Sequence, residues 1–219
     1  IRNEYMNNND DYKHSELRSI SYVSWSKEPS PSDSLNAKEL AMNLYERAKS
    51  GEDFSTLANE YSMDPSNQNT RGGDLGWFKE GKMVKSFDDA AFKAKKNQIV
   101  GPVSSNFGYH IIYVRDKKVS ENGSNEVLAS HILIRIEISP TTISNIKKEA
   151  IIFSYDAQDF GFEKALTEHQ LAAKSYNRFN DSEYTVQGLG GLRAAVRFAF
   201  NNKINDVSDI LENNEFFVI

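Results

Sequence analysis

The strongest constraint on the fold is an internal repeat, because a chain that carries one pattern twice is expected to fold into two similar units. The segment SYVSWSKEPSPSD near the start resembles the segment SHILIRIEISPTT in the second half. Tyr22 aligns with His131 and Pro31 aligns with Pro140, so both pairs lie 109 positions apart (131 − 22 and 140 − 31).

Two further segments repeat in the same order. FSTLANEYSM, from Phe54, resembles FEKALTEHQL, which starts at Phe162, 108 positions later. VGPVSSNFGYHII, from Val100, resembles VSDILENNEFFVI, which starts at Val207, 107 positions later and without a gap. The offset decreases by one residue per segment, as small changes in loop length would produce. We therefore interpret the 219 residues as two related domains rather than as chance similarity.

Each copy has the pattern of an α+β domain. The copies begin with ISYVSW and ASHILIRIEI, which are rich in residues that favour strands. In the first copy, three segments with helical spacing of apolar residues follow at 32–51, 53–62 and 86–94. Residues 99–116 then read as two short strands joined by a turn. This order predicts a small antiparallel sheet flanked by helices, in a domain of about 100 residues.

The segment KVSENGSNE, residues 118–126, is polar and contains an Asn-Gly pair, which is typical of a linker. We therefore expect an N-terminal helical extension at residues 1–17 and a first domain at 18–117. The linker at 118–126 would then lead to a second domain at 127–219.

Several kinds of function have no support in the composition. The net charge is −5 without a basic block, which argues against nucleic acid as a partner. Cysteine is absent, and no histidine lies at metal-ligand spacing from another, so we expect no metal site. Gly76, Gly81 and Lys82 approach a phosphate-binding loop, but Met83 stands where Ser or Thr is required, so we expect no nucleotide. No apolar run is long enough to cross a bilayer.

With its segments in this order, the first copy resembles the parvulin family of peptidyl-prolyl isomerases. The resemblance rests on GEDFSTLANEYSMDPS, RGGDLGWFKEGKMVKSFDDAAF and IVGPVSSNFGYHIIYV, which together cover most of a parvulin domain. The polar N-terminal segment and the weaker second copy resemble multidomain extracytoplasmic bacterial foldases of the PpiD, SurA and PrsA kind. The resemblance implies the FKBP-like parvulin fold, a location in the bacterial periplasm or cell envelope, and a parent protein that is anchored in a membrane. Residues 1–17 would end a helical chaperone segment.

The resemblance also implies a small apolar pocket for the substrate proline ring. Leu75, Met83 and Phe87 would line this pocket after the glycine-rich bend, and Phe107 would form part of its wall. A Met and a Phe four positions apart near a short helix are compatible with an apolar cup, since Met adapts to irregular shapes. Without the resemblance, both would be read as ordinary core residues.

The same resemblance assigns polar residues to the pocket. Asp64 aligns with the acidic or thiol position beside the rotating bond, Ser105 with a hydroxyl position, and His110 with the second of two facing histidines. Read without the family, Asp64 is a turn residue before a proline and His110 is a core histidine.

One position departs from the family pattern. The first-strand histidine of parvulins is Tyr22 in the first copy, where we place it in the pocket, whereas the second copy keeps this histidine as His131. The second copy has Phe217 where His110 would align. Each copy would therefore hold one histidine of the pair. The second copy also has no counterpart of residues 83–87, so we expect it to be a degenerate domain without an active site.

The sequence thus predicts a peptidyl-prolyl cis-trans isomerase that needs no cofactor and acts on unfolded or extended proline-containing polypeptides. Its activity would be reduced by the replacement at Tyr22. The alternative is a peptide-binding chaperone or scaffold module that holds such polypeptides without turning them over.

Overall fold

The computed structural model describes residues 16–67, 71–121 and 123–219, and the chain divides into two compact units. The central unit is the continuous segment Pro29–Ser139. The terminal unit combines residues 16–28 with Pro140–Ile219. The terminal unit is therefore built from the two ends of the chain, with the central unit inserted between them.

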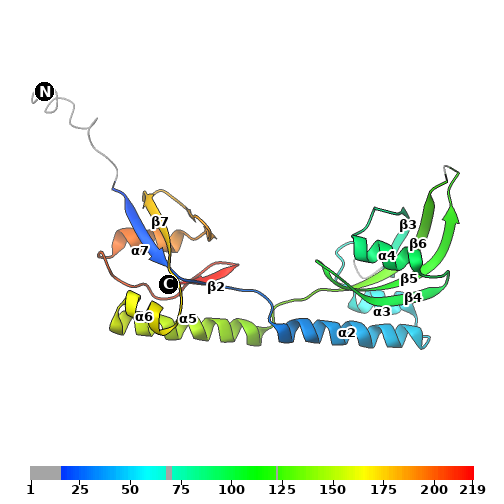
Figure 1. Ribbon diagram of the computed structural model, residues 1–219, viewed down its shortest axis with the longest axis horizontal. Coiled ribbons are helices and arrows are strands. Elements are labelled where there is room, and N and C mark those ends of the chain that lie inside the picture. The colour runs from blue at the N-terminus through cyan, green and yellow to red at the C-terminus, as the bar shows by residue number, and fades with distance from the viewer. Residues whose placement is uncertain (1–15, 68–70, 122) are drawn as a thin grey trace, which may run out of the picture. The chain divides into compact units, whose positions relative to one another are not determined.

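The central unit contains one four-stranded antiparallel sheet with three helices (Figure 1). The strand order is β3-β6-β5-β4, so the last strand in the sequence lies inside the sheet. The strands are β3 (Asp74–Lys79), β4 (Gln98–Ser105), β5 (Gly108–Val119) and β6 (Asn125–Ile134), and the helices are α2 (Pro31–Lys49), α3 (Phe54–Tyr61) and α4 (Lys85–Lys93).

Helix α2 begins at a capping box. The side chain of Ser30 accepts a hydrogen bond from the backbone N–H of Asp33, and the Asp33 carboxylate accepts one from the N–H of Ser30 at 2.8 Å. Pro31 occupies the first turn, where a missing N–H costs nothing. The buried positions Ala37, Ala41, Leu44 and Ala48 recur at helical spacing and turn one stripe of the helix toward the sheet.

The alternation of side chains along β5 and β6 assigns the two faces of the sheet to different helices. Ile111 and Ile132 pack with α2 and α3 in one buried cluster. Ile112 and Ala129 point to the opposite face, because successive side chains of a strand alternate, and they pack with α4 in another cluster. The two central strands are therefore buried on both faces, which explains the nearly continuous apolar run of β6.

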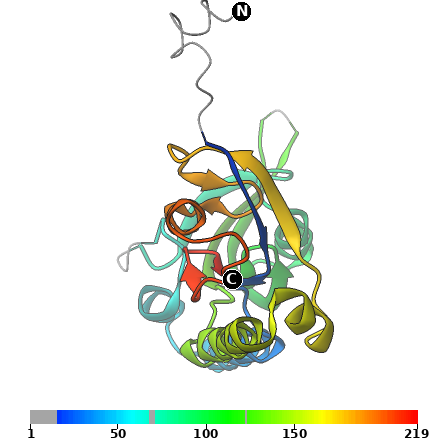
Figure 2. The same ribbon diagram turned by 90° about the vertical axis from the view of Figure 1, so that its left-hand side faces the viewer.

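The terminal unit has the same kind of architecture on a smaller scale. The segment Arg18–Ser26 forms β1 and β2, which pair with different partners (Figure 2). Between them, Val23 exchanges two backbone hydrogen bonds with Ile219, of 2.9 and 3.1 Å. The elements are β1 (Arg18–Tyr22), β2 (Ser24–Ser26), α5 (Pro140–Phe160), α6 (Phe162–Glu168), β7 (Lys174–Phe179), β8 (Thr185–Val186), β9 (Gly190–Gly191), α7 (Arg193–Asn201), β10 (Leu211–Glu212) and β11 (Phe216–Val218).

The strand pairings give both units one topology. In the terminal unit, the β1–β2 segment lies between β7 on one side and β11 on the other, with β10 beyond β11. This matches the order β3-β6-β5-β4 of the central unit. Apart from the small β8–β9 hairpin of the terminal unit, each unit thus has helix, helix, strand, helix, strand, strand in sequence, completed by an inner strand from elsewhere in the chain. The predicted class, α+β with small antiparallel sheets flanked by helices, is confirmed.

The predicted boundaries between the domains are wrong, because the two copies exchange their first strands. Residues 118–126 are the end of β5, a turn and the start of β6, which form one hairpin rather than a linker. A domain at 18–117 would lack its inner strand β6 and would include β1 and β2, which pair with β7 and β11. A domain at 127–219 would include β6 instead of β1 and β2. Residues 74–79, taken only as part of a bend, form the edge strand β3.

The predicted helical extension at 1–17 falls outside the described residues except for positions 16 and 17. Among the helices that the structure describes, none combines the length and apolarity needed to cross a membrane.

Strand exchange predicts which fragment folds. Residues 29–139, produced alone, should unfold cooperatively, because they include β6 with its buried Val127, Ala129 and Ile132. Residues 18–117 should be largely unfolded, because the sheet would lose the strand between β3 and β5. Circular dichroism and thermal unfolding of the two fragments check this expectation. Equal stability of both fragments would mean that residues 18–26 can replace β6 and would contradict the exchange.

Candidate functional site

A cavity of about 360 Å³ opens on the face of the central sheet that α4 covers. Its size falls within the range of small-ligand sites in proteins. Its walls come from the segment after α3, from β3 and α4 with the segment between them, and from β5 and β6. The lining residues are Asp64, Pro65, Leu75, Lys82, Met83, Val84, Phe87, Phe107, His110, His131, Leu133 and Arg135.

Two histidines meet at the base of this cavity because their strands are neighbours. His110 on β5 pairs with Leu133, and His131 on β6 pairs with Ile112, so the histidines are diagonal neighbours on one face. Their rings stack with centroids 5.6 Å apart and an interplanar angle of 16°. The repeat assigned His110 to the first copy and His131 to the second copy, but the structure brings the two side chains together in one site.

A continuous series of polar contacts runs through these rings. Ser105 Oγ lies 2.7 Å from His110 Nε2, and His110 Nδ1 lies 3.4 Å from His131 Nδ1. His131 Nε2 then lies 2.5 Å from Asp64 Oδ2. Asp64 Oδ1 also accepts a hydrogen bond of 2.8 Å from the backbone N–H of Ser66. We call these four side chains, Ser105, His110, His131 and Asp64, the polar chain.

The partners assign a direction to the protons of the polar chain. An ionised Asp64 can only accept, so His131 donates from Nε2. A neutral His131 then accepts at Nδ1 from His110, and His110 accepts at Nε2 from the hydroxyl of Ser105. The hydroxyl oxygen of Ser105 in turn accepts from the backbone N–H of Phe107 at 3.0 Å. Every member therefore has a partner while both imidazoles are neutral.

The electrostatics agree with this assignment. Burial, with a smaller contribution from neighbouring His131, lowers the pKa of His110 to about 4. Burial also lowers the pKa of His131, and the bond to Asp64 offsets this only in part. Burial alone would raise the pKa of Asp64, but hydrogen bonds from Ser66 and His131 outweigh it, so this pKa lies below its usual value. At neutral pH the site holds two neutral imidazoles and one carboxylate.

Phe87 joins the polar chain to the apolar part of the cavity. Its ring stands edge-on to both imidazoles, with centroids 5.3 Å from His110 and 5.6 Å from His131. Phe87 is buried, whereas Phe107 at the rim is half exposed. Leu75 and Met83, partly buried in the same cluster, continue the apolar wall. The cavity thus offers an apolar cup whose polar wall is the polar chain.

The glycine-rich bend before β3 positions the strand of His131. Gly73 accepts a hydrogen bond from the N–H of His131 at 2.9 Å and has a φ of +72°. A Cβ on Gly73 would lie 2.2 Å from the carbonyl oxygen of His131, so the close approach requires glycine. Buried Asn67 holds the bend by accepting from Gly73 N–H and donating to the carbonyl of Ala58, both at 2.7 Å.

The predicted pocket residues lie together, with one exception. Asp64, Leu75, Met83, Phe87, Phe107 and His110 line the cavity, and Ser105 contacts it through His110. Tyr22 is the exception: it is buried in the terminal unit, where its hydroxyl donates to the carbonyl of Gln187 at 3.1 Å. Placing Tyr22 in the pocket was wrong because β1 pairs with β7 and β6 takes the inner position of the central sheet.

The consequence is that the pair of histidines is complete. His131 occupies the place that the sequence analysis gave to Tyr22, so the expected loss of one family histidine is corrected. Its segment SHIL already had the family pattern, but the repeat assigned it to the wrong unit. Asn67, which holds the bend, and Arg135, which lines the cavity, were also missed, since no local pattern distinguishes them from loop and surface residues.

Within residues 16–67, 71–121 and 123–219, no group of three or more His, Asp or Glu side chains is arranged to hold a metal ion.

Comparison with known proteins gives a consistent match. Residues 6–118 match the family model described as the PPIC-type PPIASE domain. Foldase protein PrsA of Geobacillus kaustophilus (strain HTA426) is 44% identical over 115 residues, which are 52% of this chain and 39% of that protein. Foldase protein PrsA of Bacillus subtilis (strain 168) is 41% identical over 97 residues, which are 44% and 32% of the two chains. The chain thus aligns with well under half the length of these relatives.

A solved structure of peptidylprolyl isomerase (PrsA) from Bacillus cereus aligns with 88% of this chain and 53% of its own, with 28% identity and a TM-score of 0.35.

The pKa of His110 predicts an unusual titration. A histidine in an unfolded chain has a pKa of about 6.5, so His110 should stay neutral until the pH approaches 4. The folded state therefore takes up this proton later than the unfolded state, and stability should fall as the pH drops from about 6.5 toward 4. NMR titration of the imidazole resonances and melting temperatures across this range check both expectations. Titration of His110 near 6.5 would contradict the buried, neutral assignment.

The close approach at Gly73 predicts a large effect of one methyl group. Gly73→Ala should destabilise the protein by about 2 kcal/mol or more, through positive φ and through collision with the strand of His131. Gly76→Ala is the matched control, because Gly76 has a φ of +66° but open space around a Cβ. Urea unfolding of both variants separates the strain from the collision. Equal losses would show that the approach to His131 contributes nothing.

Proposed function

Because the chain belongs to the PPIC-type peptidyl-prolyl isomerase family, the parvulins, we propose that its central unit catalyses cis–trans isomerisation of the peptide bond before proline. The observation that carries this proposal is the apolar cup beside the polar chain. Phe87, Met83 and Leu75 provide a surface for a pyrrolidine ring, and His110 with His131 stand behind it.

The reaction needs no bond-breaking chemistry. Rotation about the X-Pro bond is slow because amide resonance opposes it, with a barrier of about 18–20 kcal/mol. An isomerase therefore has to hold the ring and bind the twisted amide better than either planar form. In the twisted state the nitrogen regains its lone pair and the carbonyl loses its conjugation, so fixed polar groups near the amide can favour it.

The residues have separate roles in this proposal. The cup around Phe87 holds the proline ring, while Asp64, held ionised by Ser66 and His131, presents a fixed carboxylate at the edge of the cup. His110 and His131 are positioning residues that fix the Asp64 carboxylate at one end of the polar chain and the Ser105 hydroxyl at the other. Because the polar chain is already satisfied, it does not have to reorganise during rotation.

The substrates we propose are unfolded or extended polypeptides that contain proline. The cup accepts one ring and its neighbouring residues from the open side, where Phe107 is half exposed. The relatives named foldase protein PrsA support a role in the folding of extracytoplasmic proteins in the bacterial cell envelope. Attachment of the parent protein to a membrane and location in a periplasm belong to the same proposal.

The terminal unit, in this proposal, is a degenerate parvulin-like domain without an active site. The repeat aligns Tyr22 with His131 and Phe217 with His110, but only the first pair corresponds in the structure. Tyr22 packs with Val218 against α7, whereas Phe217 packs against α5 on the opposite face. Both are buried in apolar clusters of the terminal unit.

Substitutions in the polar chain test the activity. Asp64→Asn and His131→Gln should each lower kcat/KM for an X-Pro peptide by about 10- to 100-fold, the effect of losing a hydrogen bond to a charged group. His169→Gln is the matched control, because His169 forms a 2.7 Å contact with Asp156 in the terminal unit. A protease-coupled isomerisation assay, with circular dichroism of each variant, provides the measurement. A parent protein that binds peptides without accelerating isomerisation would instead be a peptide-binding module.

A further inference from the structure

We propose that Asp88 is a positioning residue of the isomerase site, which holds the part of the cup that carries Met83 in place beside the proline ring. The inference rests on the proposed function and adds a residue to it. Asp88 lies on α4 next to Phe87, but it is not among the residues that line the cavity. Its effect on a substrate therefore has to act through the wall of the cup.

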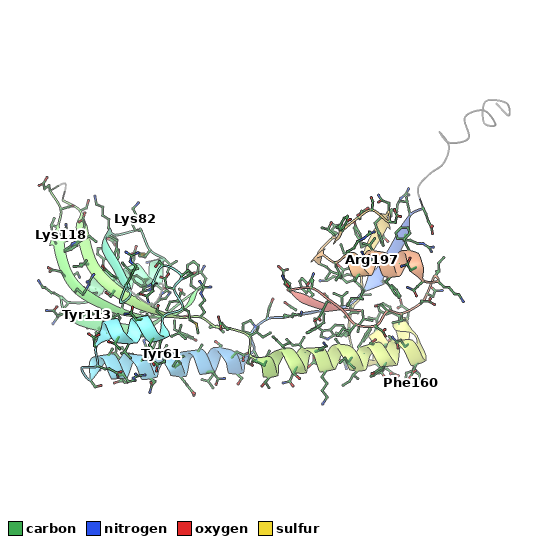
Figure 3. All side chains as sticks on the ribbon, turned by 180° about the vertical axis from the view of Figure 1, so that it is seen from behind. Tyr61, Lys82, Tyr113, Lys118, Phe160 and Arg197 are labelled. Atoms are coloured by element: carbon green, nitrogen blue, oxygen red, sulfur yellow. The ribbon has the colours of Figure 1, made fainter. Side chains whose placement is uncertain are left out.

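Residues 80–84, between β3 and α4, form this part of the wall, and we call them the wall segment. Lys82, which Figure 3 labels, lies in the middle of the wall segment and lines the cavity together with Met83 and Val84. Residues 80–82 are exposed, whereas Met83 and Val84 are half-buried. Because a segment outside helices and strands has few backbone hydrogen bonds of its own, contacts from other side chains decide how firmly it is held.

A side-chain hydrogen bond fixes the start of the wall segment. Asp88 Oδ2 accepts it from the backbone N–H of Gly81 at 2.6 Å. Gly81 has a φ of +83° and open space around a Cβ, so glycine is needed there for the backbone conformation and not for a close approach. A second bond, from the N–H of Lys82 at 3.3 Å, stays within the turn after β3. Asp88 thus ties the turn that precedes Met83 to the helix that carries Phe87.

The stability of α4 does not explain why the Asp88 carboxylate is buried. The residue is 6% exposed, and its Oδ1 has no hydrogen-bond partner within the part of the chain that the structure describes. A carboxylate near the start of a helix gains from the helix dipole, but an exposed side chain has this gain without the cost of burial. The contact that accounts for the buried carboxylate is the one that its other oxygen makes with the wall segment.

Loss of this hydrogen bond should weaken peptide binding and leave the rotation of bound peptide nearly unchanged. A hydrogen bond to a charged group shifts an equilibrium by roughly 10- to 150-fold. Met83 and Val84 keep their contacts in the α4 cluster, so we expect Asp88→Ala to raise KM and the dissociation constant by only about 3- to 30-fold. The polar chain comes from other elements, so kcat should stay within about 2-fold of the parent value.

The test uses the full chain and a blocked peptide with a single alanine–proline bond. Protease-coupled isomerisation at several peptide concentrations gives kcat and KM, and NMR titration gives the dissociation constant. Asp89→Ala is the matched control, because it makes the same change at the next position of α4, where Asp89 pairs with the exposed Lys85 at 2.9 Å. Asp88→Asn keeps an oxygen that can accept from Gly81 and should return KM to near the parent value. A KM for Asp88→Asn as high as for Asp88→Ala would contradict the role of this bond.

A double variant shows whether Asp88 acts through the wall segment. Met83→Ala alone should raise KM, because it removes an apolar contact with the proline ring. Adding Asp88→Ala to Met83→Ala should then raise KM by less than about 2-fold more, since the side chain that Asp88 holds in place is already absent. Full multiplication of the two effects would overturn the proposal, because Asp88 would then act independently of the wall.

A measurement on the parent protein tests the same bond without any variant. The amide proton of Gly81 should exchange with solvent at least about 10-fold more slowly than in an unfolded chain, although the residue itself is exposed. Exchange at the unfolded rate would overturn the inference, whether or not Asp88→Ala folds.

The outcomes separate a positioning role from a structural one and from the function on which the inference rests. If Asp88 only stabilises the fold, Asp88→Ala would lower the melting temperature and the apparent kcat at an unchanged KM, which would overturn the inference. KM does not depend on the folded fraction of a preparation, so partial misfolding does not obscure the result. Absence of turnover in the parent would overturn the isomerase assignment, and the dissociation constants of parent and variant would still decide whether Asp88 holds the wall segment.

Discussion

The central unit depends on one structural event, the insertion of β6 between β3 and β5. β6 makes the sheet continuous, fills both of its faces with apolar side chains, and carries His131 into the site. The glycine-rich bend is adapted to the same strand, since Gly73 can approach the backbone of His131 only without a Cβ. Stability and site geometry therefore have a common origin, and a change that displaces β6 disturbs both.

The polar chain is the second consequence of this insertion. Buried imidazoles are costly unless each nitrogen has a partner. The neighbouring strands provide those partners in sequence, from Ser105 through His110 and His131 to Asp64. Neutral rings allow Phe87 to pack edge-on against both of them without burying a net positive charge. The apolar cup and the fixed carboxylate can then stand side by side in one small cavity.

Local features of the fold were accessible from the sequence, whereas the pairing of strands was not. Helical spacing identified the segments that became α2, α3 and α4, and the family motifs identified Phe87, Met83, Asp64 and His110 as neighbours. The inner strand of each sheet comes from far away in the chain, and two similar segments compete for each place. Because the two segments have similar sequences, the sequence pattern is compatible with either segment in either sheet. Tyr22 and His131 were therefore assigned to the wrong units.

The side chains themselves explain why the exchanged pairing is preferred. With each first strand in its own copy, His131 would take the place of Tyr22 in the apolar cluster that contains Val196 and Val218, without the polar neighbours that it has in the central unit. A buried polar group left unpaired costs about 1–3 kcal/mol. Tyr22 would bring a larger ring against Phe87 and His110, and would lose its hydrogen bond to Gln187. In the exchanged pairing, the imidazole of His131 contacts the carboxylate of Asp64 instead, and Tyr22 and Phe217 lie in apolar clusters. The contacts of Tyr22 and His131 thus favour the strand pairing that the structure has, and they confine the histidine pair to one unit.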